Sequence, residues 1–342
     1  MKVLVTGGSG YFGSLLVELL REKGYQADSL DINDADDRPE EVTFHQVDIR
    51  DGKTLTETVN GYEVIFHNVA QVPLAKNLSL FSSVNIDGTR NICNAALEAG
   101  CRKLVYTSSS AVFGVPKENP VTEKTEPRPG EAYGRAKLEG ERICRKSSEA
   151  GLDLTIIRPR TILGHGRLGI FQILFEWVRQ GIRIPVLNGG GNVYQFVHAR
   201  DLADACAAAS ERPVSTIYNI GADQFGTMRE SLEGLCRYAS TGSTVFLLPM
   251  KPVEWMMNLS SSLGLSPLGP YHALMYGRSL YFDTAKARQE LNFRPAYSNL
   301  EMLIESYEWY LRNRKRLNAQ KEPLSHHRTA VNEGILKLMR LF

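Results

Sequence analysis

The chain has 342 residues, which is enough to bury a sizeable core and to form two lobes. Its hydrophobic fraction of 43% and charged fraction of 23% are ordinary for a soluble globular protein, and a formal net charge of +2 does not indicate a nucleic-acid partner. No apolar stretch approaches the roughly 20 residues that a transmembrane helix needs. The five cysteines are scattered and never form a CxxC pair, which indicates reduced, mostly buried thiols. We therefore expect a cytoplasmic protein without a signal peptide, a nucleic-acid partner or a metal site.

In chain order, short apolar runs alternate with amphipathic segments. We expect helices near 11–23, 55–59, 85–99, 132–150 and 170–179, and strands at Lys2–Val5, Gln26–Leu30, Thr43–Gln46, Val64–His67, Lys103–Thr107 and Leu154–Arg158. Strand–helix alternation predicts an α/β fold with a Rossmann doubly wound parallel sheet. The alternation is lost after about residue 165, so we predict a Rossmann lobe at 1–165, to which segments near 193–222 return. Residues 166–342 are expected to form a smaller mixed α/β substrate-binding lobe and a C-terminal tail.

The first strand runs into TGGSGYFG, residues 6–13. In a doubly wound sheet this turn between the first strand and the first helix is where a dinucleotide binds. Gly7 allows a sharp turn, Gly10 permits close approach of a pyrophosphate, and Gly13 lets the helix pack near the strand, its N-terminus supplying amide donors. An ordinary glycine-rich turn explains a lone motif of this kind equally well.

Acidic residues follow the next two strands. Asp31 lies about 20 residues beyond the glycine loop, where a carboxylate can accept hydrogen bonds from the ribose hydroxyls of adenosine and would repel a 2′-phosphate. This position favours NAD over NADP. Asp48 and Ile49 could contact the adenine ring, although Asp48 is equally plausible as a turn residue.

The segment EAYGRAKLEGE places Tyr133 and Lys137 four residues apart, on one face of a helix. A free tyrosine is a poor base because its pKa is near 10, but a neighbouring ammonium group favours the phenolate. Such a tyrosine can take a proton from an alcohol while hydride leaves for a cofactor. The spacing alone is common by chance. About 25 residues earlier, however, YTSSSAVFG supplies hydroxyl groups that could hydrogen-bond a substrate oxygen.

Together with IIRPRTILG, QFVHARDLADA and YNIGA, these motifs resemble the extended short-chain dehydrogenases/reductases of the NAD-dependent epimerase/dehydratase family. The resemblance covers roughly residues 1–310. It implies that Tyr133 is the catalytic base, that Lys137 activates it and binds ribose, and that Ser109 is the catalytic hydroxyl, with Ser108 and Ser110 as alternatives. It further implies NAD-binding roles for Gly7, Gly10, Tyr11, Phe12, Gly13, Asp31, Ile32, Asp48, Ile49, Asn68, Val69, Ala70, Asn85, Tyr133, Lys137 and Pro159.

Two departures from the family pattern bear on the substrate. Sugar-nucleotide dehydratases carry an Asp–Glu pair where this chain has Ser110 and Ala111, which disfavours dehydration. Many sugar-nucleotide enzymes also have an arginine at the position of Tyr194, where it pairs with the diphosphate. Three other arginines could replace it as phosphate partners, although a surface or structural role is expected first for each: Arg160, Arg167 and Arg278. We predict an NAD-dependent epimerase of the nucleotide-sugar 4-epimerase type. The alternative is a hydroxysteroid-dehydrogenase-like enzyme or ketoreductase on an apolar hydroxy or keto substrate.

The second lobe and the tail add four expectations. The Met- and aromatic-rich segments VEWMMNLSSSLGL and YHALMYG suit an apolar pocket or ordinary core. RNRKR, residues 312–316, is expected to be the solvated end of a helix, and Asp201 the N-cap of the helix LADACAAA. The final segment GILKLMRLF could lie on a membrane surface or a partner, and docking on its own fold or on the second subunit of an expected homodimer is favoured.

Overall fold

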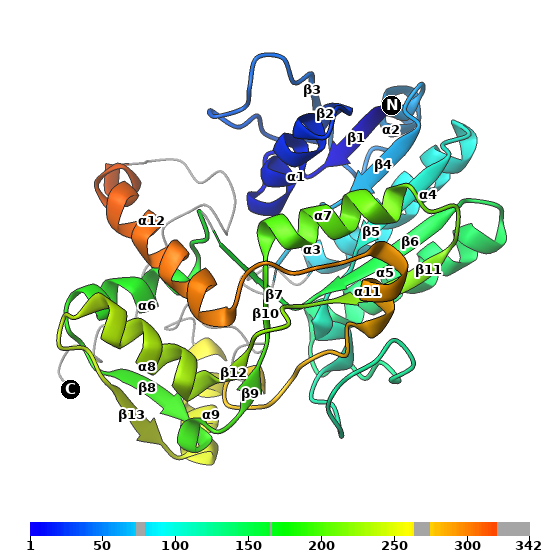
Figure 1. Ribbon diagram of the computed structural model, residues 1–342. Helices are drawn as coiled ribbons and strands as arrows, with labels where there is room; N and C mark the ends of the chain where they lie inside the picture. The colour runs from blue at the N-terminus through cyan, green and yellow to red at the C-terminus, as the bar shows by residue number, and fades with distance from the viewer. Residues whose placement is uncertain (73–78, 165, 263–273, 320–342) are drawn as a thin grey trace.

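The computed structural model describes residues 1–72, 79–164, 166–262 and 274–319. Its centre is a sheet of seven parallel strands in the order β11–β6–β5–β4–β1–β2–β3 (Figure 1). The strands are β1 (Lys2–Thr6), β2 (Gln26–Asp31), β3 (Phe44–Gln46), β4 (Val64–His67), β5 (Lys103–Thr107), β6 (Leu154–Pro159) and β11 (Thr216–Ile220). The predicted fold class is confirmed.

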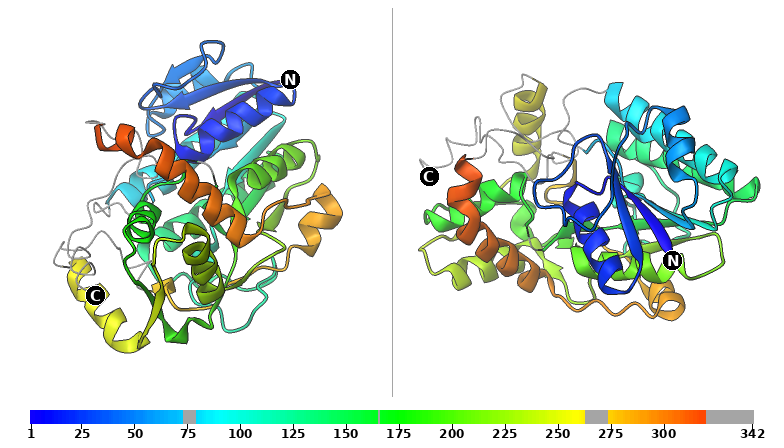
Figure 2. Two further views of the ribbon diagram at one scale, coloured as in Figure 1. Left: turned by 60° about the vertical axis from the view of Figure 1, so that its left-hand side comes forward. Right: turned by 90° about the horizontal axis from the view of Figure 1, so that it is seen from above.

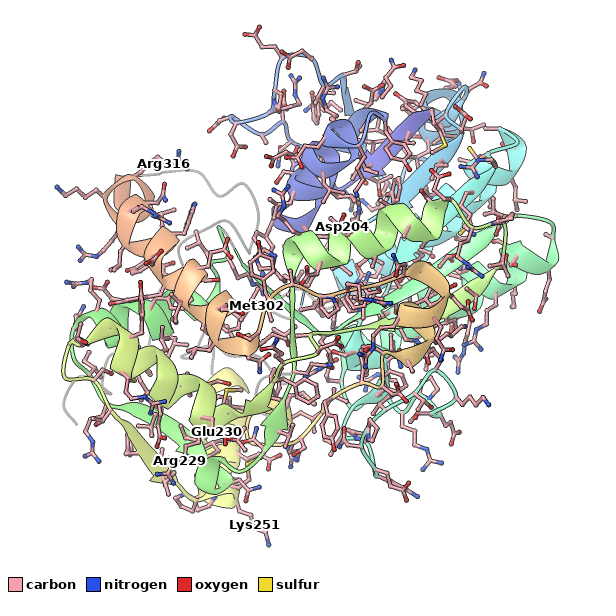
Figure 3. The ribbon with its side chains drawn as sticks, in the orientation of Figure 1. Asp204, Arg229, Glu230, Lys251, Met302 and Arg316 are labelled. Carbon is pink, nitrogen blue, oxygen red and sulfur yellow. The ribbon has the colours of Figure 1, made fainter. Side chains whose placement is uncertain are left out.

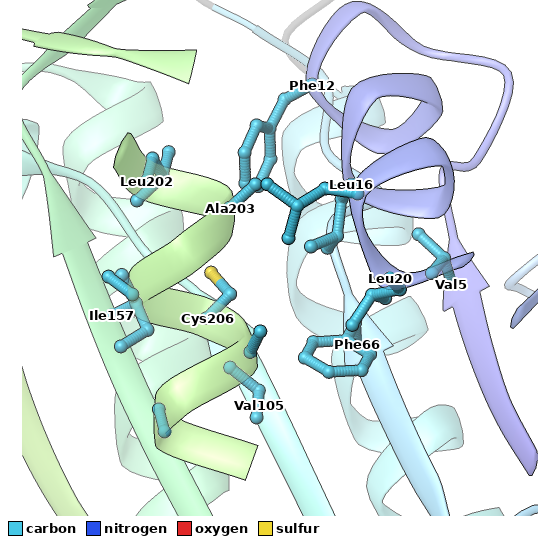
Figure 4. Packing of buried hydrophobic residues seen from close by; sticks show 14 of the residues in the cluster. Val5, Phe12, Leu16, Leu20, Phe66, Val105, Ile157, Leu202, Ala203 and Cys206 are labelled. Atoms are coloured by element: carbon cyan, nitrogen blue, oxygen red, sulfur yellow. The ribbon is translucent and has the colours of Figure 1, made fainter. Parts of the chain in front are cut away.

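Helices cover both faces of this sheet (Figure 2). One hydrophobic cluster joins the sheet to α1 (Tyr11–Glu22), α7 (Ala199–Ser210) and α11 (Ala285–Leu291). The other joins it to α2 (Gly52–Val59), α4 (Thr89–Glu98) and α5 (Ala132–Glu149). Figure 4 shows α1 and α7 side by side, with Leu16, Leu20, Ala203 and Cys206 packed above Phe66 and Val105. The sheet is therefore buried on both sides.

The apolar runs of the sequence are continuous because both strand faces are buried. In β1, Val3 and Val5 belong to the cluster beneath α1 and α7, whereas Leu4 belongs to the cluster on the opposite face. The register pairs Thr6 of β1 with His67 of β4, and His67 with Tyr106 of β5. Since all strands run in the same direction, their polar C-terminal residues meet at one edge of the sheet.

The second lobe has its own core, formed mainly by α6 (Ile170–Arg179), α8 (Met228–Ala239) and α12 (Asn299–Ala319) with β8 (Ile184–Leu187). Its other elements are β9 (Val193–Tyr194), β12 (Gly226–Thr227), β13 (Val245–Leu248) and α9 (Met250–Ser262). In Figure 3, Met302 lies on the buried side of α12, while Arg316 marks its charged end. Arg312, Lys315 and Arg316 are exposed, as expected for a solvated helix end.

The chain passes between the lobes more than once. The short strands β7 (Thr161–Leu163) and β10 (Phe196–His198) pair in parallel, and α7 and β11 then join the large sheet. The N-cap of α7 is His198, whose ring accepts a hydrogen bond from the Arg200 amide, so the prediction of Asp201 as N-cap was wrong. Asp201 lies in the first turn of the helix and accepts hydrogen bonds from the Ala296 amide, which its sequence position could not show.

Further sequence expectations concern membrane-spanning helices, the cysteines and the segments of the C-terminal third. Among the described residues, we find no helix with the length and hydropathy of a bilayer-spanning segment. All five cysteines are free and buried. The segment GILKLMRLF, the end of VEWMMNLSSSLGL and the first three residues of YHALMYG lie outside the described residues.

Candidate active site

A cavity of about 1030 Å³ lies where the C-terminal edge of the sheet faces the second lobe. With one exception, the predicted site residues line it. Those residues are Gly7, Gly10, Tyr11, Phe12, Gly13, Asp31, Ile32, Asp48, Ile49, Asn68, Val69, Ala70, Ser109, Tyr133, Lys137 and Pro159. The fold thus gathers residues from six strand ends into one cavity.

The glycine loop forms a tight turn against the start of α1. Gly7 has a φ of +74°, a conformation that favours glycine, and its amide donates to the Leu30 carbonyl, 2.8 Å away. A Cβ on Gly13 would lie 1.9 Å from the Gly7 carbonyl oxygen, so only glycine allows this approach. The N-cap residue Gly10 supplies no side-chain acceptor to the first amides of α1. These amides can therefore bind a phosphate group.

Asp31 ends β2 beside this loop. Its carboxylate accepts hydrogen bonds from the amides of Ile32 (2.8 Å) and Ser9 (3.3 Å), and burial raises its pKa. A glycine cradle, a helix N-terminus and a carboxylate at the end of the second strand are what an adenine dinucleotide requires. The residues present fit NAD.

The part of the cavity beside Asp48 contains a charged residue that sequence analysis missed. Arg50 lines the cavity and pairs with Asp48, with its Nη2 2.5 Å from the carboxylate. This pairing lowers the pKa of Asp48. Ile49, by contrast, is buried beneath the rim. The two-residue spacing of Asp48 and Arg50 is the only sequence signal of this pair.

Tyr133 is held at the start of α5. The Glu131 carboxylate caps the helix by accepting from the amides of Tyr133 and Gly134, both at 2.6 Å. A Cβ on Gly134 would lie 2.4 Å from the Ala111 carbonyl, so this glycine lets α5 pack against the loop that carries the serines. Sequence analysis missed Glu131, because glutamate is not a usual N-cap residue.

The three consecutive serines have different partners. Ser109 hydrogen-bonds Tyr133, and its Oγ accepts from the Ala111 amide at 3.1 Å. Ser108 donates to the buried carboxylate of Glu141 at 2.7 Å, and Ser110 accepts from Arg160 at 2.8 Å. Of the three, Ser109 is the one placed beside the tyrosine.

Burial raises the pKa of Tyr133 to about 12, while the hydrogen bond from Ser109 and the positive charge of Arg167 act in the opposite direction. Lys137, to which sequence analysis assigned this effect, donates instead to the Thr107 carbonyl at 2.7 Å. Burial lowers the pKa of Lys137 to about 8. The helical spacing places both groups on one face but does not determine where the ammonium group binds.

The strand ends beneath the cavity are fixed by a buried network. Thr107 donates to Asn68 Oδ1 at 2.5 Å. His67 lies between two threonine hydroxyls, with Thr6 2.8 Å from Nδ1 and Thr89 3.1 Å from Nε2. Burial, followed by the charge of Lys137, lowers the pKa of His67 to about 3. Its imidazole is therefore neutral at physiological pH.

Asn85 is the exception among the predicted cofactor residues, because it is not among the described residues that line the cavity. It is buried in a π-helical segment at Ser83–Gly88. Its Oδ1 accepts from the Gln71 amide at 2.7 Å, and its Nδ2 donates to the Gln71 carbonyl at 3.0 Å. Asn85 thus holds the backbone of Gln71, a cavity residue that sequence analysis missed.

The second lobe closes the other half of the cavity with an apolar wall. Between Ile170 and Leu303, the described lining residues are aliphatic, aromatic, proline or methionine, without a charged side chain. The hydroxyls of Tyr194 and Tyr276 are hydrogen-bonded to Thr161 and to the Pro185 carbonyl.

Two of the three arginines considered in the sequence line this cavity. Arg160 and Arg167 are both buried. Arg278 is not among the described lining residues, and its guanidinium pairs with Glu254 at 3.0 Å. Of the two roles expected for Arg160 and Arg167, surface or structural, the surface role was wrong, because tertiary packing buries both.

Comparisons with known proteins agree with this geometry. The model of the NAD-dependent epimerase/dehydratase family matches residues 3–221. An uncharacterized protein of Sinorhizobium fredii, y4nG, is 52% identical over 98% of this chain and 85% of its own length. The UDP-glucose 4-epimerase 2 of Oryza sativa subsp. japonica is 27% identical, over 91% of this chain and 82% of its own.

The 3beta-hydroxysteroid-dehydrogenase/decarboxylase isoform 1 of Arabidopsis thaliana is also 27% identical, over 97% of this chain and 83% of its own length. Among solved structures, the UDP-glucose 4-epimerase of Thermotoga maritima superposes with a TM-score of 0.77 at 22% identity, covering 92% of this chain and 99% of that one. The predicted resemblance is confirmed. The chain belongs to the NAD-dependent epimerase/dehydratase family and is an enzyme that uses NAD.

Proposed function

We propose that this enzyme interconverts a secondary alcohol and a ketone, with Tyr133 moving the proton, in the manner of a nucleotide-sugar 4-epimerase. The observation that carries the proposal is the placement of Ser109, Tyr133 and Lys137 in the same cavity as the glycine loop and Asp31. When bound, NAD supplies the acceptor for the hydride of the carbinol carbon. The residues of this chain supply binding, orientation and proton transfer.

Tyr133 takes the proton of the substrate hydroxyl and returns it when the ketone is reduced. Its pKa of about 12 requires stabilisation of the phenolate, and without substrate Ser109 and Arg167 provide part of it. Ser109 has a single hydroxyl proton, so when substrate is bound this proton shifts from Tyr133 to the reacting oxygen, while its Oγ still accepts from the Ala111 amide. Lys137, fixed by the Thr107 carbonyl, adds a buried cation and binds ribose hydroxyls.

Epimerisation, rather than dehydration, is supported by the residues next to Ser109. Ser110 accepts a hydrogen bond from Arg160, and Ala111 is buried in a short 3-10 turn. Neither side chain can exchange a proton with the substrate carbon, as an acid–base pair for water loss must. In an epimerase the ketone is reduced again from its other face, so no net oxidation takes place.

A second candidate is supported by the apolar wall of the second lobe. Leu174, Trp177 and Met257 are typical of the wall residues, which present little to hydrogen-bond a sugar or a nucleotide base. A net dehydrogenase or ketoreductase acting on an apolar hydroxy or keto compound would suit this surface. Such an enzyme releases its ketone, whereas the epimerase keeps it bound.

The test is the Tyr133→Phe variant. We expect turnover to fall by about 100- to 10,000-fold, the usual contribution of general acid–base catalysis. Tyr238→Phe, which alters an exposed tyrosine on α8, is the matched control and should keep wild-type activity. UDP-sugars are assayed by product analysis, and apolar 3-hydroxy acids and alcohols by absorbance at 340 nm. Full activity in Tyr133→Phe would refute the proposed role.

The homodimer, the cytoplasmic location and the lobe boundary near residue 165 stay predictions.

A further inference from the structure

Arg167 is a buried cation inside the cavity. The central carbon of its guanidinium lies 5.4 Å from the ring centre of Tyr11 and 5.7 Å from that of Phe171, and the residue is 8% exposed. No hydrogen bond or ion pair joins its side chain to any described residue, and its Nε is fully buried. Burial lowers its pKa to about 10, so it is still charged at neutral pH. A buried charge without a partner is costly, which indicates that a ligand completes the site.

Arg160 supplies a second cation to the same cavity. It follows β6 and is 1% exposed, with Nη1 donating to Ser110. Its Nε and Nη2 have no hydrogen-bond partner among the described residues. The guanidinium lies 4.6 Å from the ring centre of Tyr194. Arg160 therefore places a buried positive charge beside Tyr194, from the single residue between β6 and β7.

No described lining residue of the substrate half balances these charges. The carboxylates that line the cavity are Asp31 and Asp48, both at the adenosine end, and Asp48 is already paired with Arg50. Guanidinium groups bind carboxylates and phosphates through paired hydrogen bonds. The substrate half therefore combines two cations with an apolar wall.

We propose that Arg160 and Arg167 bind an anionic group, a carboxylate or a phosphate, of a substrate whose remaining body packs against the apolar wall. This inference rests on the proposed function, since it concerns the substrate of the same cavity. The anion would lie close to Tyr133 and Ser110, and so on the part of the substrate that carries the reacting carbon.

Binding of matched acid and neutral probes to the NAD-loaded protein tests this site. The carboxylate arm compares 3-hydroxydecanoic acid with its methyl ester, and the phosphate arm compares UDP with uridine. Calorimetry is carried out on the wild type, Arg160→Met, Arg167→Met and Arg167→Lys, with the exposed Arg142→Met as control. Each measurement is repeated in Tyr133→Phe, so that failure of the proposed proton transfer does not prevent detection of binding. Urea unfolding checks that every variant is folded, and NAD affinity is measured separately for each.

We expect at least one acid to bind more tightly than its neutral partner. Each methionine variant should lower the affinity for that acid by about 10- to 100-fold and leave the affinity for the neutral probe unchanged. Arg167→Lys should retain part of the preference, and Arg142→Met all of it. The preferred arm identifies the anion as a carboxylate or a phosphate. Equal binding of acid and neutral probes in both arms would overturn the proposal. A loss of NAD affinity in Arg167→Met as large as the loss of acid affinity would assign Arg167 to the cofactor instead.

Discussion

The glycine loop makes its strongest prediction at Gly13. An alanine there would place its Cβ 1.9 Å from the Gly7 carbonyl oxygen, 2.7 Å from its carbonyl carbon and 2.9 Å from the Gly8 Cα. All three contacts are with backbone atoms, so no side-chain rotation can relieve them. The loop and α1 must separate by about 1.5 Å to restore ordinary contact. We expect the free energy of unfolding to fall by about 1–3 kcal/mol, as for other overpacked sites.

The same displacement moves the first amides of α1 away from the pyrophosphate. Because hydrogen bonds to a charged group contribute about 1.5–3 kcal/mol each, loss of one should weaken NAD binding by about tenfold or more. Urea unfolding of the apoprotein measures the first effect, and calorimetric titration with NAD measures the second.

Gly52→Ala is the matched control for this substitution. Gly52 also begins a helix of the Rossmann lobe, but its added Cβ would lie at an ordinary 3.6 Å from Asn91. This variant should keep or slightly raise stability, since alanine favours a helix over glycine. Wild-type stability and NAD affinity in Gly13→Ala would refute the reasoning.

Two further predictions concern Asp31 and His67. Asp31→Ala should relax the preference for NAD over NADP, measured as the ratio of their dissociation constants; an unchanged ratio would contradict the role assigned to the carboxylate. Between pH 6.5 and about 3, His67 is neutral in the folded protein but protonated in the unfolded chain. The free energy of unfolding therefore falls by about 1.4 kcal/mol for each pH unit as the pH decreases through that range. Urea unfolding at pH 7 and pH 5.5 should therefore show a smaller pH dependence in His67→Gln, and an equal dependence would disprove this account.

Local patterns account for the residues that were placed correctly. Val3, Leu4 and Val5 are followed by glycines at a spacing that permits one kind of turn, so the strand, loop and helix could be predicted together. The position of Asp31 follows in the same way, since a parallel strand ends at the same edge as its neighbour. Such features follow from local motifs and from the direction shared by neighbouring parallel strands.

Residues whose role depends on distant contacts were predicted less well. Asn85 stays a predicted cofactor residue, but its hydrogen bonds to the backbone of Gln71, 14 residues away, were not predicted. Asp201 was expected to cap a helix, but it reaches Ala296 instead, 95 residues away. Neither contact leaves a signal in the local sequence.

By itself, the sequence determined the doubly wound sheet, the family, the cofactor and the residues expected to move a proton, because periodicity and motif spacing are local properties. Tertiary structure decided which of three serines lies beside Tyr133, where the ammonium group of Lys137 binds, and that Arg160 and Arg167 face a cavity rather than solvent. The physical reason is burial: whether a polar side chain is exposed, paired or left without a partner depends on elements that are far apart in the chain and meet only in the folded protein.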